Sequence, residues 1–134
     1  MRYWHRVVPS VASISQWHDA LHAGMKPGGI MDANDVVLAV REGRSLAGQN
    51  LAGLDLSGQD LKKALLQKAN LSNCKLQGTD LRGADLSQSN LYNADLSGAK
   101  LRGANLAGSN RMLAKINKWG LKGAYITGPT AYLD

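Results

Sequence analysis

Leucine recurs at every fifth position through the middle of the chain, from Leu46 to Leu106, without an interruption. At about 100° of rotation per residue, leucines five apart do not line one face of an α-helix. In a straight β-strand, side chains alternate between two faces, so leucines five apart lie on opposite sides. The pattern therefore predicts a chain that turns once per repeat and directs every leucine inward.

The residues around each leucine predict a short extended piece followed by a corner. The residue two before the leucine is small in most repeats, as at Ala84, Ala94 and Ala104, and residues two apart in extended chain share the inward face. The residue just before the leucine is Asp or Asn in nine of thirteen repeats and is expected to point outward. The residue two after it is glycine in eight repeats, and glycine accepts the positive φ of a turn.

These positions resemble the motif A(D/N)LXX of the pentapeptide-repeat family, and the resemblance extends over about half of the chain. The outright matches are Ala84-Asp85-Leu86, Ala94-Asp95-Leu96 and Ala104-Asn105-Leu106. The resemblance implies an all-β solenoid: a right-handed quadrilateral parallel β-helix with four repeats per coil, and about four coils here. The predicted core consists of Leu51, Leu56, Leu61, Leu66, Leu71, Leu76, Leu81, Leu86, Leu91, Leu96, Leu101 and Leu106.

Four repeats make twenty residues, so outward residues twenty apart are expected to stack. Two such columns agree with this spacing, although neither served to find the repeat. One is an asparagine ladder, Asn50, Asn70, Asn90 and Asn110, and the other alternates in charge, Asp55, Lys75, Asp95 and Lys115. Stacked amides hydrogen-bond along a ladder, and neighbouring opposite charges attract.

Residues 1–43 are predicted to form an N-terminal arm and an α-helical cap. A helix is expected over residues 30–43, with Asp32 as its N-cap, Gly43 past its end, and Met31 and Val36 as a hydrophobic staple. An uncovered β-helix end exposes apolar side chains and unpaired backbone, so we interpret this helix as a lid on the first coil. An earlier helix is predicted over residues 13–22.

Residues 44–128 are predicted to form the β-helix, with an irregular last coil from about residue 109, and residues 129–134 form a tail. Arg111 takes a leucine position, where an unpaired charge is costly, yet Ile116, Leu121 and Ile126 return to register. The alternative is a short helix over residues 110–119 that closes the end. Trp119, Tyr125 and Tyr132 then either cap the coil or form a dimer contact, so the chain is predicted to be a monomer or a dimer through this end.

The sequence predicts no enzyme, no cofactor and no metal site. All three histidines precede the repeats, and the repeat motif explains most of the aspartates. His18 and His22 have a spacing that suits one metal ion, but two ligands do not make a site, so we expect solvated histidines. Cys74, the single cysteine, takes an inward position and is expected to be a buried core thiol.

The formal net charge is +6, and part of it follows one corner of the predicted coil. From Ala47 to Thr127, the residue just after the central position is basic only at Lys62, Arg82, Arg102 and Lys122, all twenty apart. Lys63 and Lys100 add to this stripe, whereas Asp60 and Asp80 neutralise part of it. The stripe is interpreted either as a solvated, partly paired face whose columns match by accident, or as the site of an anionic partner. For the second interpretation we predict an acidic protein surface first, and nucleic-acid phosphates second.

The leading hypothesis is therefore a non-enzymatic scaffold for protein–protein interaction. The resemblance also offers two alternatives: a DNA-mimic protein that interacts with gyrase or topoisomerase IV and protects it from quinolones, or an exported bacterial effector or developmental regulator. DNA mimicry needs an acidic surface, which a basic chain does not offer.

The sequence has neither an apolar run near the roughly 20 residues of a membrane span nor a signal-peptide pattern. We expect cytoplasmic residence, with export without a cleaved signal as the open alternative.

Overall fold

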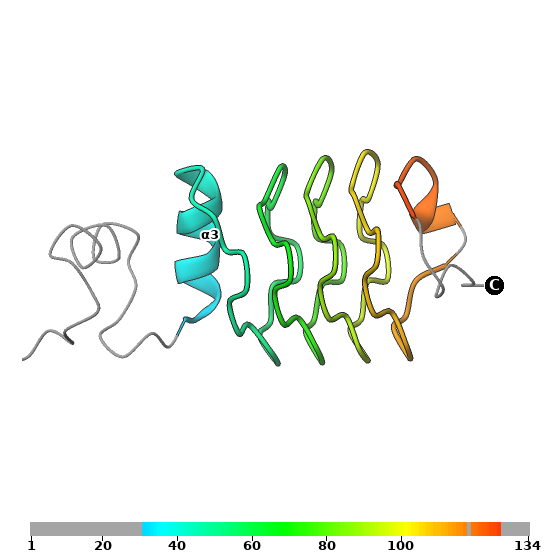
Figure 1. The fold of residues 1–134 in the computed structure, drawn as a ribbon, viewed down its shortest axis with the longest axis horizontal. Coiled ribbons are helices and arrows are strands. Elements are labelled where there is room, and N and C mark those ends of the chain that lie inside the picture. Colours follow the sequence, from blue (N-terminus) through cyan, green and yellow to red (C-terminus); the bar gives the residue numbers. More distant parts are fainter. Residues whose placement is uncertain (1–30, 118, 127–134) are drawn as a thin grey trace, which may run out of the picture.

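The structure, a computed structural model, describes residues 31–117 and 119–126, and begins with helix α3 (Ala33–Arg41) followed by stacked coils (Figure 1). A 3-10 helix, η1 (Trp119–Leu121), interrupts the last coil. The predicted arm, the helix over residues 13–22, the histidines and the tail lie outside the described residues.

Parallel β-bridges join residues twenty apart on each of four sides of the coil, so the described repeats turn once every twenty residues. The bridged residue is the one just before each central position. The first side carries Ser45, Leu65, Asp85, Asn105 and Tyr125; the second carries Asn50, Asn70, Asn90 and Asn110; the third carries Asp55, Lys75, Asp95 and Lys115; the fourth carries Asp60, Asp80 and Lys100. Each side contributes a single bridged residue per coil in the described part of the chain, instead of a longer strand.

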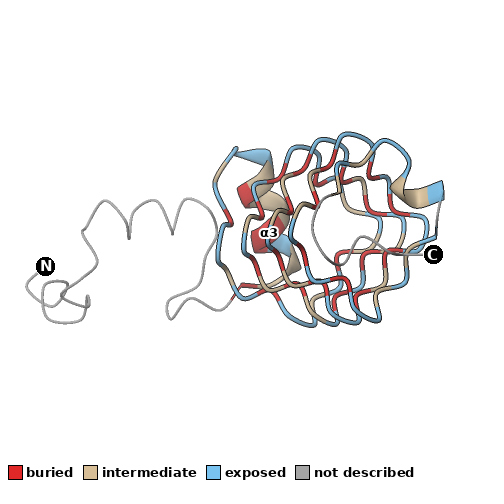
Figure 2. Cartoon of the chain, turned by 45° about the vertical axis from the view of Figure 1, so that its right-hand side comes forward, coloured by how far each residue is buried: buried red, intermediate tan, exposed pale blue. Residues whose placement is uncertain are grey.

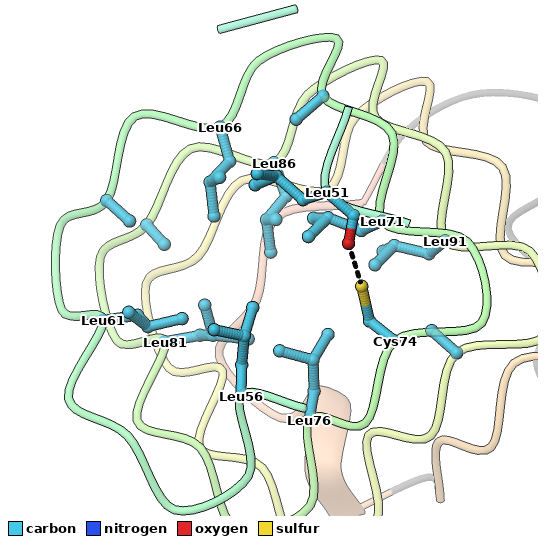
Figure 3. Packing of buried hydrophobic residues seen from close by; sticks show 14 of the residues in the cluster. Leu51, Leu56, Leu61, Leu66, Leu71, Cys74, Leu76, Leu81, Leu86 and Leu91 are labelled. Carbon is cyan, nitrogen blue, oxygen red and sulfur yellow. Dashed lines mark hydrogen bonds between the residues drawn. The ribbon is translucent and has the colours of Figure 1, made fainter. Parts of the chain in front are cut away.

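The central leucines fill the interior from all four sides (Figure 3). All twelve leucines of the predicted core are at most 2% exposed. The inward polar side chains are satisfied by backbone carbonyls: Thr79 Oγ1 donates to Leu56 O at 2.8 Å, and Cys74 Sγ lies 2.9 Å from Leu51 O. Burial raises the pKa of the Cys74 thiol. The core leucines therefore enclose a thiol and hydroxyls that are paired with backbone carbonyls inside it.

The Asp or Asn before each central leucine has a local structural task. Its side chain accepts a hydrogen bond from the backbone N–H two residues later, as from Ala52 to Asn50 at 3.3 Å and from Ser97 to Asp95 at 3.0 Å. This Asx turn leads the chain into a β-turn closed by a bond such as Ala64 N to Leu61 O at 3.1 Å. Of the two central turn residues only the second has positive φ, as in a type II turn.

Leu113 occupies one of these positive-φ corners, with φ +59°, and its side chain is 64% exposed. Asn73 and Asn93 hold the same corner in the two preceding coils, and Asn93 Nδ2 donates to Asn73 Oδ1 at 2.8 Å.

We therefore expect Leu113→Asn to raise the free energy of unfolding by about 1 kcal/mol, because asparagine tolerates the left-handed conformation better than leucine. It also extends the amide ladder. Thermal unfolding measures the effect as a rise of a few degrees in Tm. Met112→Asn is the matched control, since Met112 is equally exposed but lies outside the left-handed region. An equal change in both variants would contradict the conformational argument.

Helix α3 lies across the N-terminal end of the coil, with its buried residues toward the interior (Figure 2). Asp32 and Asp35 form a capping box: each side chain accepts from the other's backbone N–H, at 2.8 and 2.9 Å. Val36 and Ala39 are buried and join the cluster that contains the first leucines. The helix is shorter than the predicted range 30–43, because the cap places its start at Ala33 and Gly43, with φ +71°, follows its end.

The C-terminal repeats keep the coil path as far as residue 117. Arg111 is 2% exposed and takes the place of a leucine, in the column of Leu91. Asp95 is bridged to Lys115 and Asn105 to Tyr125, so residues 110–119 do not form the alternative helix. Arg111 therefore keeps the inward position although its side chain is charged.

Candidate functional site

The predicted basic residues Lys62, Arg82, Arg102 and Lys122, here called the basic column, occupy the same corner in successive coils. Backbone bonds hold the coils in register there: Gly83 N donates to Arg102 O at 3.0 Å, and Gly103 N to Gly123 O at 2.8 Å. A Cβ added to Gly123 would lie 3.1 Å from Arg102 Cγ, so the stem of the Arg102 side chain lies against Gly123 of the next coil. All four basic side chains are exposed.

The N-terminal half of the basic column is neutralised by carboxylates of the same repeats. Arg82 donates to Asp80 through Nε to Oδ1 at 2.9 Å and through Nη2 to Oδ2 at 2.7 Å. These side-chain bonds lower the pKa of Asp80 to about 2. Lys62 Nζ lies 3.7 Å from Asp60 Oδ2. Two of the four cations of the basic column are therefore paired with carboxylates of the protein itself.

The C-terminal half has the opposite environment. On the fourth side, Lys100 takes the place that Asp60 and Asp80 hold in the preceding coils. Within the described residues, Lys100, Arg102 and Lys122 form no ion pair. From Leu96 to Ile126 the sequence contains six Lys or Arg residues and neither Asp nor Glu. Positive charge thus gathers toward the last coil.

The two sequence-predicted ladders differ in how their members interact. In the asparagine ladder, Asn70 Nδ2 donates to Asn50 Oδ1 at 3.2 Å, and Asn110 to Asn90 at 3.3 Å. In the column of alternating charge, the carboxylates are bound first by serine hydroxyls, as Asp95 is by Ser97 at 2.6 Å. The lysines act on these carboxylates from farther away, so the column is mainly a set of local caps.

The carboxylates of these caps make the fold sensitive to acid. Hydrogen bonds from Arg82 lower the pKa of Asp80 to about 2, and bonds from serine hydroxyls lower the pKa of Asp55, Asp85 and Asp95 from the ordinary value of 3.8. A lowered folded-state pKa stabilises the protein above the unfolded value, and this contribution is lost as pH falls through the folded value.

We therefore expect a nearly constant Tm above about pH 5 and a decline between about pH 4 and pH 2, as these carboxyls become protonated. Thermal unfolding followed by circular dichroism at each pH measures the decline. Asp80→Asn keeps an oxygen for the Arg82 N–H and should make the decline shallower. An acid profile identical to that of the unchanged protein would show that Asp80 contributes nothing.

The described residues offer little for catalysis or metal binding. They contain no group of three or more His, Cys, Asp or Glu side chains able to hold a metal ion. A depression of about 270 Å³ lies between α3 and the coil, lined by Val37, Val40, Arg41, Gln59, Asp60 and Lys62. None of these six residues carries a hydroxyl or thiol nucleophile. Neither described helix has the length and apolar character that a membrane crossing requires.

Large apolar side chains are exposed mainly on the last coils. Trp119 is 81% exposed and Tyr125 is 60% exposed. Met112, Leu113 and Tyr92 lie at another corner of the coil, away from the basic column. The sequence singled out Trp119 and Tyr125, but not that they share the C-terminal part of the coil with cations that have no acidic partner among the described residues. The change from Asp80 to Lys100 in one column is the sequence signal that would have revealed it.

Comparison with known proteins gives a consistent result. A sequence model of pentapeptide repeats matches residues 45–78 and 69–108, in eight copies. A solved pentapeptide repeat protein from Nostoc Pcc 7120 is 33% identical over 74% of this chain and 98% of that chain, with a TM-score of 0.57. A pentapeptide repeat protein from the thylakoid lumen of Arabidopsis thaliana is 28% identical over 79% and 66%, with a TM-score of 0.42.

HetL from Nostoc sp. strain PCC 7120, a pentapeptide repeat protein involved in heterocyst differentiation regulation, is 37% identical over 60% of this chain and 40% of that chain, with a TM-score of 0.30. None of the curated proteins matches the chain.

Proposed function

Because the chain belongs to the pentapeptide-repeat family, we propose that it is a non-enzymatic scaffold that binds another protein through the outward faces of its coils. The observation that carries the proposal is the basic column, which is exposed on one corner of a rigid, regularly spaced surface. Like charges stacked at the spacing of adjacent strands repel one another, so an anionic partner relieves that repulsion on binding.

The rest of the surface supports binding rather than chemistry. The aspartates between the corners are used as turn caps, and the buried hydroxyls bond to backbone carbonyls. The coils hold the side chains of each column at a fixed repeat, which presents a preorganised surface to a partner. An acidic protein surface is therefore the partner that we propose.

The charge distribution argues against the DNA-mimic alternative. A mimic of duplex DNA needs an acidic surface, whereas this chain carries a net charge of +6 and its last coil contains no carboxylate side chain. A gyrase supercoiling assay with a quinolone tests the alternative directly, and protection at any ratio of protein to enzyme would revive it.

The proposal is tested by affinity capture from the native host followed by mass spectrometry. We expect a specific protein with an acidic surface to bind the unchanged chain, and its recovery to fall with Arg82→Glu plus Arg102→Glu. Both side chains are exposed, so folding should survive. Lys68→Glu, an exposed charge reversal at a different corner, should leave recovery unchanged. If the partner binds the double variant as tightly as the unchanged chain at low salt, the basic column is not the binding surface.

A further inference from the structure

The basic column is not uniform, because its cations differ in what surrounds them. Lys62 and Arg82 have carboxylate partners in their own repeats, whereas Arg102 and Lys122 have none within the described residues. Lys100 is exposed on the fourth side, two residues before Arg102. Lys63, in the N-terminal part of this corner, is exposed and also has no carboxylate partner among the described residues. Uncompensated positive charge is nevertheless concentrated near the C-terminal end, where Lys100, Arg102 and Lys122 follow one another.

Two exposed aromatic side chains adjoin the same end of the column. Trp119 begins η1, three residues before Lys122, in the coil that follows Lys100. Tyr125 is bridged to Asn105 on the first side, just past the corner that carries Lys122. Their exposed fractions, 81% and 60%, leave most of both rings in water. Exposed cations and exposed aromatic rings therefore occur together in the C-terminal part of the coil.

We propose that the surface formed by Lys100, Arg102, Trp119, Lys122 and Tyr125, here called the C-terminal basic edge, binds an acidic segment of a partner protein that also carries apolar side chains. The proposal rests on the proposed function and narrows it from the whole basic column to one end. The carboxylates of the segment pair with the three cations, and its apolar side chains cover the two rings.

The combination of residues fits a protein interface. Tryptophan, tyrosine and arginine are the residues most enriched at the energetic centres of such interfaces, where partners remove them from water. An ion pair near an aromatic surface is also stronger than one in open solvent, since the apolar contact excludes water from its surroundings. An acidic segment without apolar groups would gain only the weaker, solvent-screened part of this interaction.

The neighbouring carboxylates favour a short acidic segment over a nucleic acid. A single-stranded nucleic acid needs a positive track that follows several phosphates, with bases stacked on aromatic rings. From Lys100 toward the N-terminal end of this corner, the next two coils place the carboxylates of Asp80 and Asp60 beside the cations. These carboxylates repel phosphates, so the available positive surface ends within about two coils. A compact acidic segment fits that length.

The test measures binding of the full chain to a fluorescent synthetic peptide of glutamates and leucines by anisotropy at low salt. We expect Arg102→Glu plus Lys122→Glu to weaken binding by at least about tenfold. Lys62→Glu plus Arg82→Glu is the matched control, with the same charge change in the same column, and should weaken binding by less than about threefold. The thermal unfolding of both variants shows whether each remains folded.

The contribution of the exposed aromatic rings to peptide binding is tested separately. Trp119→Ser should weaken binding of the same peptide by about fivefold or more, and should have little effect on a peptide with serine in place of leucine. Tyr92→Ser, an exposed aromatic change at another corner, is its control.

The outcomes separate this proposal from the broader one. Equal losses from both charge-reversed pairs would overturn the C-terminal basic edge and leave the column-wide interaction standing. No loss from either pair would count against both. An oligothymidylate that binds more tightly than the peptide, and through Arg102 and Lys122, would identify a nucleic-acid site and overturn the protein partner.

Discussion

Replacing Leu86 with aspartate is expected to unfold the protein. Leu86 is fully buried, and Leu66 and Leu106 occupy its place in the adjacent coils. An unpaired carboxylate in such an environment costs several kcal/mol, or is protonated at a similar cost. Since single domains have a free energy of unfolding of about 5–15 kcal/mol, the change removes much or all of it. Circular dichroism on heating measures the loss.

Leu65→Asp is the matched control for this prediction. Leu65 comes just before Leu66, the leucine that takes the place of Leu86 in the preceding coil. It points outward and occupies the position where other repeats place Asp or Asn. A carboxylate there can accept the N–H of Gln67 as the other caps do, so we expect a change of less than about 1 kcal/mol. An Leu86→Asp protein that melts at the temperature of the Leu65→Asp protein would contradict the buried column.

Replacing Val36 with aspartate is expected to detach helix α3 from the coil. Val36 has no exposed surface, and it packs in the cluster that includes Met31, Ala39 and Leu46. A buried carboxylate costs several kcal/mol there, which the protein avoids by releasing the helix. The first coil then presents leucines and unpaired backbone groups to other molecules. We expect a lower Tm and aggregates in size-exclusion chromatography with light scattering.

Asn34→Asp provides the comparison on the same helix. Asn34 is exposed in the first turn, where a negative charge interacts favourably with the helix dipole. This variant should keep the solubility and Tm of the unchanged protein. A monomeric Val36→Asp protein with an unchanged Tm would mean that α3 does not protect the end of the coil.

The sequence predicted those features that depend on spacing. Because burial repeats with the coil, the period of the leucines predicted the core, and the twenty-residue register predicted which side chains stack. The capping box at Asp32 and Asp35 was readable for the same reason, since it depends on residues three apart. The spacing of residues along the sequence was therefore sufficient to predict the core, the stacking and the start of the helix.

Features that depend on side-chain direction were less predictable. Asp80 reaches Arg82 in its own repeat, and the serine hydroxyls reach the aspartate two residues before them, rather than neighbours in the next coil. Several rotamers of these exposed side chains are compatible with the sequence, so the backbone period alone does not choose among them. The sequence thus located the basic column and the two aspartates that neutralise part of it, but not the side-chain geometry of these pairs.

The core and the surface of this coil repeat with different periods, and this affects how the protein can change by insertion. The leucine core recurs every five residues, whereas each outward column recurs every twenty. An insertion of one five-residue repeat between Arg82 and Arg102 keeps every leucine inward, but it moves all later residues to the next side of the coil. Arg102 and Lys122 would then lie on a different corner from Lys62 and Arg82. Only the gain or loss of a whole coil changes the length of the molecule while its surface pattern stays in phase.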